Sequence, residues 1–202
     1  MVRFRVSHLV SIMMAFATAA CTTTQGPEPS RSELTGPKQE FIAPAKGSVY
    51  NTGGDWRVSS VQRDGMRVRL DEVNGDSHVL LIGGIQIFPP LEGADYSISE
   101  ARDLWPLQVG KTAYFTVDHD MGRGWSHRLE VTRREEITVP AGTFDTYVVK
   151  VRERSIANAY EAVVTYWYAP KVRAPVKRAV KQIRGNPNRA PFELQGYELA
   201  SS

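Results

Sequence analysis

From Ser48 onward, hydrophobic and polar residues alternate along the chain with a period of two. Successive side chains of a β-strand point to opposite faces, so this alternation predicts strands with one buried face. The segment 66–71 alternates apolar with charged residues, and in the segment 112–117 Ala113, Phe115 and Val117 alternate with Thr112, Tyr114 and Thr116. The clearest alternating strand places five residues on one face: Tyr160, Ala162, Val164, Tyr166 and Tyr168.

Turn residues divide these segments at short intervals. Asp64-Gly65 and Asn74-Gly75 are typical of β-hairpins, because both residue types tolerate a positive φ. The segment 78–82 is apolar on both faces, which favours a central strand. About nine or ten strands with turns every 8–12 residues indicate an all-β fold, an antiparallel half-open barrel or sandwich. One short helix is expected over 98–104, since Ser97 and Glu100 have capping-box spacing.

The N-terminus has the pattern of a bacterial export signal. Arg3 and Arg5 precede a mostly apolar run, Leu9–Ala20, which is followed by Cys21. The run is shorter than the roughly 20 residues that cross a bilayer as a helix, so it predicts a cleaved signal peptide. Small residues followed by Cys21 resemble the bacterial lipobox, although Thr18 stands where Leu is usual.

The lipobox resemblance implies cleavage between Ala20 and Cys21 and lipidation of Cys21 with acyl chains of the palmitate type. It also implies attachment to the cell envelope. Thr22 stands where an Asp would favour the inner membrane, so we expect the outer membrane, facing the periplasm. The alternative is an ordinary secretory signal that leaves Cys21 as a free thiol.

The predicted domain organisation is a signal peptide over 1–20, a flexible tether over 21–47 and a single β domain over 48–200. The tether is rich in Pro, Ser, Thr and Gln and has few apolar residues to offset the entropy cost of ordering. Its length would allow the domain to stand clear of the lipid headgroups.

The net charge of the chain does not alter the predicted fold, and it argues against one class of partner. The formal charge of +3 falls to about +1 once Arg3 and Arg5 are removed, because 23 basic side chains then face 22 acidic ones. An exported, nearly neutral chain is not expected to bind nucleic acid. A single cysteine also excludes an internal disulfide.

Three motifs follow one another in the second half: Pro106-Leu107-Gln108-Val109-Gly110-Lys111, Pro140-Ala141-Gly142-Thr143-Phe144 and Tyr166-Trp167-Tyr168-Ala169-Pro170, closed by Val176-Lys177-Arg178. This order resembles a group of bacterial envelope proteins of unknown function, over roughly 104–180. The resemblance implies an antiparallel half-open β structure akin to the lipoprotein-carrier (Lol-like) folds. It implies no known catalysis and no defined ligand.

The same motifs have a structural interpretation. Pro140 and Gly142 suit a turn, and Phe144 is expected to plug the core beneath it. Trp167 is expected to lie on the opposite face of its strand from Tyr166 and Tyr168.

Two clusters could carry chemistry. Asp118-His119-Asp120 with His127 offers metal-binding groups, but the spacing matches no known site, and His127 lies on an apolar face. A core or pocket histidine is therefore favoured, and no metal is expected. Ser126 lies in a segment that resembles the nucleophile elbow only superficially, because the final glycine is absent.

The basic stretch 171–189 contains no acidic residue and has two interpretations, a solvated strand face or a contact with an anionic envelope surface. Its candidate contact residues are Lys171, Arg173, Lys177, Arg178, Lys181, Arg184 and Arg189. A pocket on the concave face could be lined by Trp56, Tyr114, Trp125, His127, Tyr147 and Tyr166, each of which also suits a core.

We therefore expect a non-enzymatic, membrane-anchored envelope lipoprotein with a β-rich binding or scaffolding domain and no cofactor. Its partners would be the membrane, through the N-terminal lipid, and a lipid-like ligand or an envelope protein. One alternative is an interaction module of an envelope complex that uses the stretch 171–189. Another is an enzyme of unknown type.

Overall fold

The structure is a computed structural model, which describes residues 34–63, 65–86, 101–117, 124–155, 159–187 and 189–201. These residues belong to one compact unit, Ser32–Ser202. The other unit, Met1–Arg31, lies outside the described residues, as do the predicted signal peptide and Cys21.

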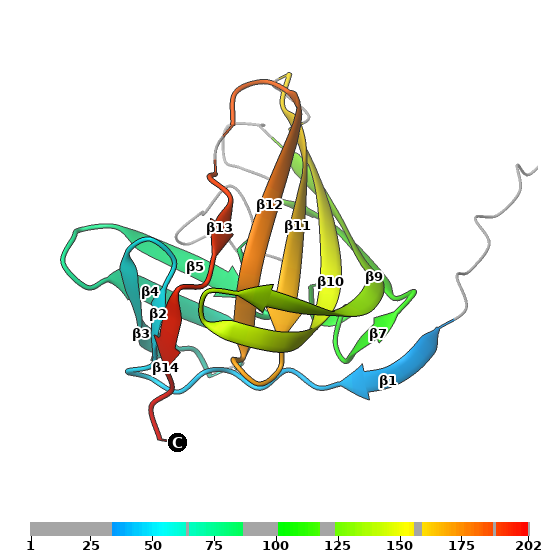
Figure 1. The fold of residues 1–202 in the computed structure, drawn as a ribbon. Helices are drawn as coiled ribbons and strands as arrows, with labels where there is room; N and C mark the ends of the chain where they lie inside the picture. Colours follow the sequence, from blue (N-terminus) through cyan, green and yellow to red (C-terminus); the bar gives the residue numbers. More distant parts are fainter. Residues whose placement is uncertain are drawn as a thin grey trace, which may run out of the picture. The chain divides into compact units, whose positions relative to one another are not determined.

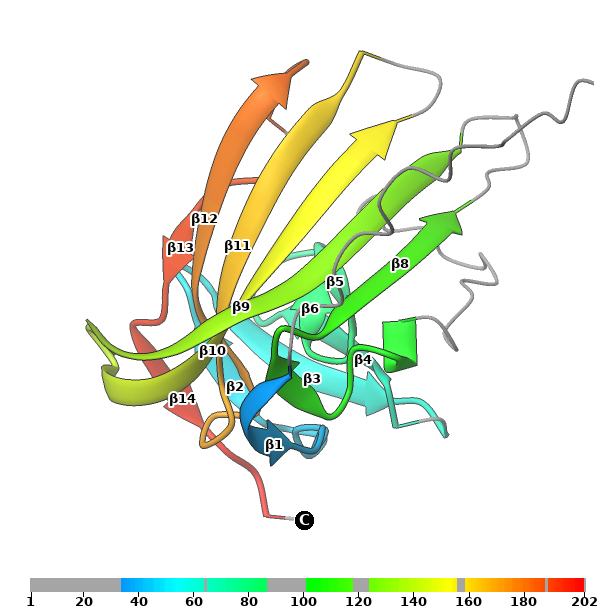
Figure 2. The same ribbon diagram turned by 90° about the vertical axis from the view of Figure 1, so that its right-hand side faces the viewer.

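The larger of two six-stranded sheets, the long sheet, is antiparallel throughout and has the order β13-β12-β11-β10-β9-β8. Figure 2 shows its long strands fanning out side by side. Strands that are consecutive in the sequence are neighbours throughout this sheet, which is the simplest antiparallel arrangement. Its strands are β8 (Thr112–Val117), β9 (Trp125–Val139), β10 (Gly142–Ser155), β11 (Glu161–Ala169), β12 (Ala174–Arg184) and β13 (Phe192–Glu193).

The second sheet, the short sheet, has the order β14-β2-β3-β4-β5-β6 and faces the long sheet across the core (Figure 1). A separate two-stranded ladder joins β1 to β7. The strands concerned are β1 (Thr35–Gln39), β2 (Val49–Asn51), β3 (Asp55–Val61), β4 (Arg67–Glu72), β5 (His78–Ile82), β6 (Ile85–Gln86), β7 (Leu107–Val109) and β14 (Gly196–Glu198).

The predicted all-β antiparallel class is confirmed. The described residues form 14 strands, more than expected, because several are only two or three residues long and leave no clear period. The predicted helix over 98–104 falls partly outside the described residues, and within them only residues 101–102 are helical.

Both predicted turns in the first half connect hairpins, β3 to β4 and β4 to β5. Gly65 has a φ of 67°, the conformation for which glycine was expected. Its amide donates to Gln62 O over 2.8 Å, which closes a loop wider than a two-residue turn.

The segment 78–82 forms β5, an interior strand that pairs with β4 on one side and with β6 on the other. It is not at the middle of the sheet, because β6 is the edge strand. Its two faces are apolar because each packs against a different hydrophobic cluster, with Leu80 against one and Leu81 against the other. Both faces of β5 are therefore apolar because each one packs against a hydrophobic cluster, and not because β5 lies at the middle of the sheet.

The predicted tether extends too far toward the domain, because residues 34–47 include ordered structure. β1 pairs with β7, and the Tyr147 hydroxyl donates to Pro37 O over 3.0 Å. Phe41 packs against both hydrophobic clusters. These few contacts anchor a segment whose composition alone is typical of a linker.

The tip of the long hairpin β9–β10 packs into one of the two hydrophobic clusters, the one that contains Tyr50, Phe144 and Leu194. Pro140 and Ala141 form the turn, and the Ala141 amide donates to Leu194 O over 3.0 Å. Phe144 is 4% exposed and lies 6.0 Å from the ring of Tyr197. The structural interpretation of this motif is confirmed.

β11 shows the predicted alternation. Tyr166 and Tyr168 are each 1% exposed in the core, whereas Trp167 lies on the opposite face and donates to Glu135 Oε1 over 2.5 Å. Burial of one large side chain contributes about 1.5–3 kcal/mol, so the buried face of this strand is a main source of stability.

Candidate functional site

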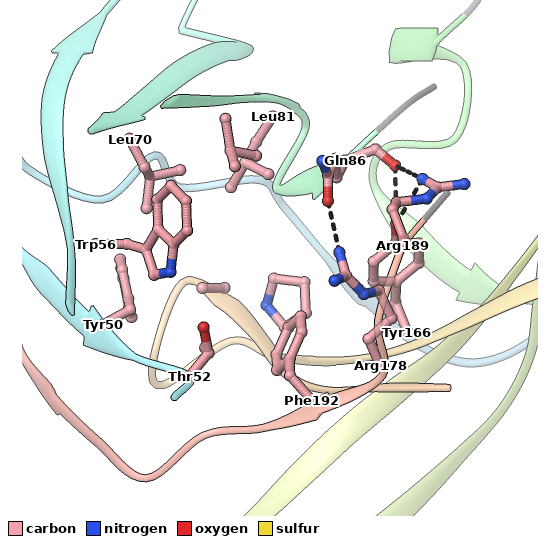
Figure 3. A pocket seen from close by; sticks show the side chains of 13 residues that line it. Tyr50, Thr52, Trp56, Leu70, Leu81, Gln86, Tyr166, Arg178, Arg189 and Phe192 are labelled. Carbon is pink, nitrogen blue, oxygen red and sulfur yellow. Dashed lines mark hydrogen bonds between the residues drawn. The ribbon is translucent and has the colours of Figure 1, made fainter. Parts of the chain in front are cut away.

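A pocket of about 280 Å³ lies between the two sheets. Figure 3 shows Trp56, Leu70 and Leu81 on one side of it and Arg178 with Gln86 on the other. Strands of both sheets contribute, so the pocket exists only because the two layers pack together. Its lining is Tyr50, Thr52, Trp56, Leu70, Val79, Leu81, Gln86, Tyr166, Ala174, Pro175, Arg178, Arg189 and Phe192.

The apolar wall follows from strand alternation in the short sheet. Leu70 of β4 pairs with Val79 of β5, so both side chains point to the same face. Leu81 follows Val79 by two residues and continues that face. Phe192, on β13 of the long sheet, also lines the pocket.

The opposite end of the pocket is polar and closely hydrogen-bonded. The Tyr166 hydroxyl donates to Gln86 O over 2.8 Å, and Arg189 Nη1 donates to the same oxygen over 3.0 Å. Arg189 Nη1 also lies 3.2 Å from the Tyr166 hydroxyl. One backbone carbonyl of β6 therefore holds two side chains of distant segments in place.

Arg189 forms a buried ion pair with Glu153 of β10. The exposed fractions of the two side chains are 3% and 0%. Burial by itself lowers the pKa of Arg189, but Tyr166 and Glu153 outweigh this effect, so its pKa is raised. The guanidinium is therefore held in its charged form beside the carboxylate.

Arg178 lines the pocket beside this pair. Its Nη1 donates to Gln86 Oε1 over 2.5 Å, and its Nε and Nη2 donate to Ala190 O over 2.8 and 2.6 Å. Its guanidinium lies 4.8 Å from the ring centroid of Phe192. Burial lowers the pKa of Arg178, which shows that part of its hydration has been removed.

The tyrosines of the pocket are deeply buried. Burial raises the pKa of Tyr50 and that of Tyr166 above the ordinary range. The Tyr50 hydroxyl donates to Val172 O over 3.0 Å. Both hydroxyls therefore stay protonated at neutral pH and act as hydrogen-bonding groups.

The aromatic residues proposed for a pocket are dispersed. Trp56 and Tyr166 line the pocket between the sheets. Trp125 packs 5.0 Å from Tyr160 in the core, and His127 is fully buried, stacked 4.8 Å from Phe115. Tyr114 is 61% exposed and points away from the core.

Tyr147 contributes to a different hollow of about 370 Å³, between β1 and the β9–β10 hairpin. Lys38, Arg134, Asp145 and Lys171 also line it. These four charged side chains among ten lining residues make this hollow a poorer match for an apolar ligand than the pocket between the sheets.

The basic stretch 171–189 does not form one continuous charged surface. Lys177 pairs with Glu193 over 2.7 Å, Arg184 with Glu161 over 2.8 Å, and Arg189 with Glu153. Arg178 lies in the pocket, Lys171 at the second hollow, and Lys181 is exposed. Arg173 occupies a turn with a φ of 59°. The acids that pair with this stretch are distant in sequence, so its composition concealed them.

The metal hypothesis falls largely outside the described residues, which exclude Asp118, His119 and Asp120. Within the parts of the chain that the structure describes, no group of three or more His, Cys, Asp or Glu residues is placed to hold a metal ion. Ser126 is the second residue of β9, where it pairs with Thr116 of β8 and Arg154 of β10 in regular strand ladders. Those same described parts contain no helix with the length and apolar character needed to span a bilayer.

Several pocket residues were not proposed from the sequence, among them Leu70, Leu81, Gln86 and Phe192. The apolar character of both faces of 78–82 was the signal for Leu81, but it was interpreted as a central strand. Gln86 carried no signal, because its role depends on contacts with residues about 80 to 103 positions away.

The middle of the chain matches the model of one protein family. A family model described as a protein of unknown function (DUF3108) matches residues 90–183, slightly less than half of the chain. The expected resemblance to a family without an assigned function is thus supported over this region, whereas the Lol-like fold stays a prediction. No curated protein matches the chain.

One similar solved structure comes from Parabacteroides distasonis ATCC 8503, a protein provisionally described as a lipoprotein. It is 15% identical, with a TM-score of 0.36, and the match covers 81% of this chain and 100% of that chain.

Proposed function

We propose that this protein is a non-enzymatic envelope lipoprotein, anchored through Cys21, whose β domain holds a lipid-like ligand between its two sheets. The observation that carries the proposal is the pocket of about 280 Å³, which has an apolar wall and one polar end. Ligand sites generally combine such walls with a few orienting polar groups.

The size of the pocket favours a slender ligand. Ligand pockets generally span about 300–1,000 Å³, and this one lies at the lower limit. A single hydrocarbon chain matches the wall of Trp56, Leu70 and Leu81. Its burial would contribute about 25 cal/mol for each Å² of apolar surface removed from water.

The lining supports binding over catalysis. Its ionisable side chains are Tyr50, Tyr166, Arg178 and Arg189. The tyrosines have raised pKa values, and guanidinium groups keep their proton in proteins. None of these groups exchanges a proton readily near neutral pH, as general acid–base catalysis requires.

The anchor is the second part of the proposal and rests on the sequence before residue 22. A diacylglyceryl group with a further acyl chain provides the two or more chains needed for stable attachment. We propose that the protein resides in the outer membrane and faces the periplasm. Cys21→Ser should release the protein into the soluble fraction, whereas the matched variant Thr22→Ser should stay with the membrane. Retention of Cys21→Ser in the membrane fraction would contradict the anchor.

The ligand is tested by native mass spectrometry of the full chain purified from its own host. We expect a retained mass of lipid size in the wild type. Leu81→Trp should lose this mass because the larger side chain fills the pocket, while Tyr114→Ser, which changes an exposed side chain, should keep it. A wild-type protein free of any added mass, which also binds no lipid on addition, would refute the proposal.

A further inference from the structure

The polar end of the pocket carries an unbalanced positive charge. Arg189 is paired with Glu153, so these two charges compensate each other. The acceptors of Arg178 are neutral: the amide oxygen of Gln86 and the carbonyl of Ala190. Among the described residues no carboxylate forms an ion pair with Arg178, so this end of the pocket has about one net positive charge.

Arg178 also keeps hydrogen-bonding capacity. A guanidinium has five N–H donors. Three of these donate to Gln86 and Ala190, and a fourth interacts with the Tyr166 hydroxyl. At least one N–H of this cation, whose side chain lines the pocket, therefore has no acceptor among the described residues.

The position of Arg178 relative to the apolar wall determines the orientation in which an amphiphilic ligand would bind. Figure 3 shows Trp56, Leu70 and Leu81 across the pocket from Arg178. The guanidinium itself is fixed by Gln86, Ala190 and the ring of Phe192. A ligand with a charged head at Arg178 would thus place its tail along the wall.

Resting on the proposed function, we infer that the pocket selects single-chain amphiphiles with one carboxylate, which binds Arg178. A carboxylate brings one negative charge, which matches the charge of the site, and it is a strong acceptor for guanidinium donors. A phosphate monoester brings about −1.5 to −2, which exceeds the charge that the site can neutralise. Arg189 is a positioning residue, because it holds Gln86 and Tyr166 while its charge is compensated by Glu153.

Direct titration of the full chain carrying Cys21→Ser tests this inference with three probes of equal chain length: dodecanoate, dodecanol and dodecyl phosphate. Charge-assisted hydrogen bonds are roughly twice as strong as neutral ones, so we expect dodecanoate to bind at least about tenfold more tightly than dodecanol. Dodecyl phosphate should bind more weakly than dodecanoate.

Arg178→Gln should remove the preference for dodecanoate, so that the affinities for dodecanoate and dodecanol become similar, and Arg178→Lys should keep part of the preference. Lys181→Gln, on the same strand but exposed, is the matched control and should behave as the wild type. Thermal unfolding of each variant shows that the domain is folded.

The outcomes separate the two proposals. Equal affinities for dodecanoate and dodecanol in the wild type would overturn the charge selection and leave the lipid pocket standing. Tighter binding of dodecyl phosphate would overturn the assignment of a carboxylate. Binding of none of the three probes would refute the proposed function itself.

Discussion

Replacing Arg189 with methionine tests whether the buried ion pair holds the polar end of the pocket together. The substitution removes the cation that faces Glu153, a side chain with an exposed fraction of 0%. It also removes the hydrogen bonds from Arg189 to Gln86 O and to the Tyr166 hydroxyl. Methionine keeps a long apolar chain, so the principal loss is the charge and its donors.

The expected cost is large because the carboxylate stays buried. Breaking a buried ion pair by removing one partner costs about 3–5 kcal/mol, since the remaining charge loses its compensation. A domain of this size is stabilised by about 5–15 kcal/mol in total, so Arg189→Met should remove a substantial part of its stability.

Urea unfolding at neutral pH, followed by tryptophan fluorescence, measures this cost as a lower midpoint with an unchanged slope. Arg184→Met is the matched control. Its guanidinium is 59% exposed, and Glu161 keeps a second partner in Arg152, so we expect a loss of no more than about 1 kcal/mol.

A double variant identifies the cause. When Glu153→Leu is combined with Arg189→Met, both charges are removed, and most of the lost stability should return. An Arg189→Met loss as small as that of Arg184→Met would refute the argument. A double variant no more stable than the single one would show that packing, and not charge, is responsible.

Further predictions concern packing, the tether boundary, the exposed face and pH. Phe144→Ala should cost about 3–5 kcal/mol in urea unfolding, because it empties the site beneath the hairpin tip. Phe41→Ser should also lower the unfolding midpoint, whereas a true tether would show no change. Tyr114→Ser should alter stability by less than about 0.5 kcal/mol, since the ring is exposed. Hydrogen bonds from two arginines lower the pKa of Glu161, so its stabilising effect is present at neutral pH and is lost as the pH falls through that lowered pKa. Glu161→Gln should therefore lose less stability than the wild type between neutral and acidic pH.

Much of the fold could be predicted because strand periodicity is local. The alternation over 160–168 was sufficient to place Tyr166 and Tyr168 in the core and Trp167 outside it. The hairpin at 140–144 was predictable for the same reason, because turn residues and one aromatic residue specify it within five positions.

The boundary of the domain was harder to predict because it depends on distant partners. Residues 35–39 become a strand only by pairing with β7, whose residues lie 68 to 74 positions later. Phe41 gains its burial from two clusters formed by other segments. The composition of this segment correctly indicated that it is polar, but it could not show that β7 is available as a partner strand.

The candidate site shows where prediction from the sequence ended. The stretch 171–189 was recognised as basic, but its composition could not separate Arg189, paired with Glu153, from Arg178, which faces neutral acceptors. Those partners lie 36 and 92 positions away. Alternation along a strand determines which face a side chain occupies, and this much the sequence by itself determined. Only the packing of two sheets decided which side chains meet across the core, because that packing brings Gln86 of one sheet and Tyr166 of the other together and so forms the pocket.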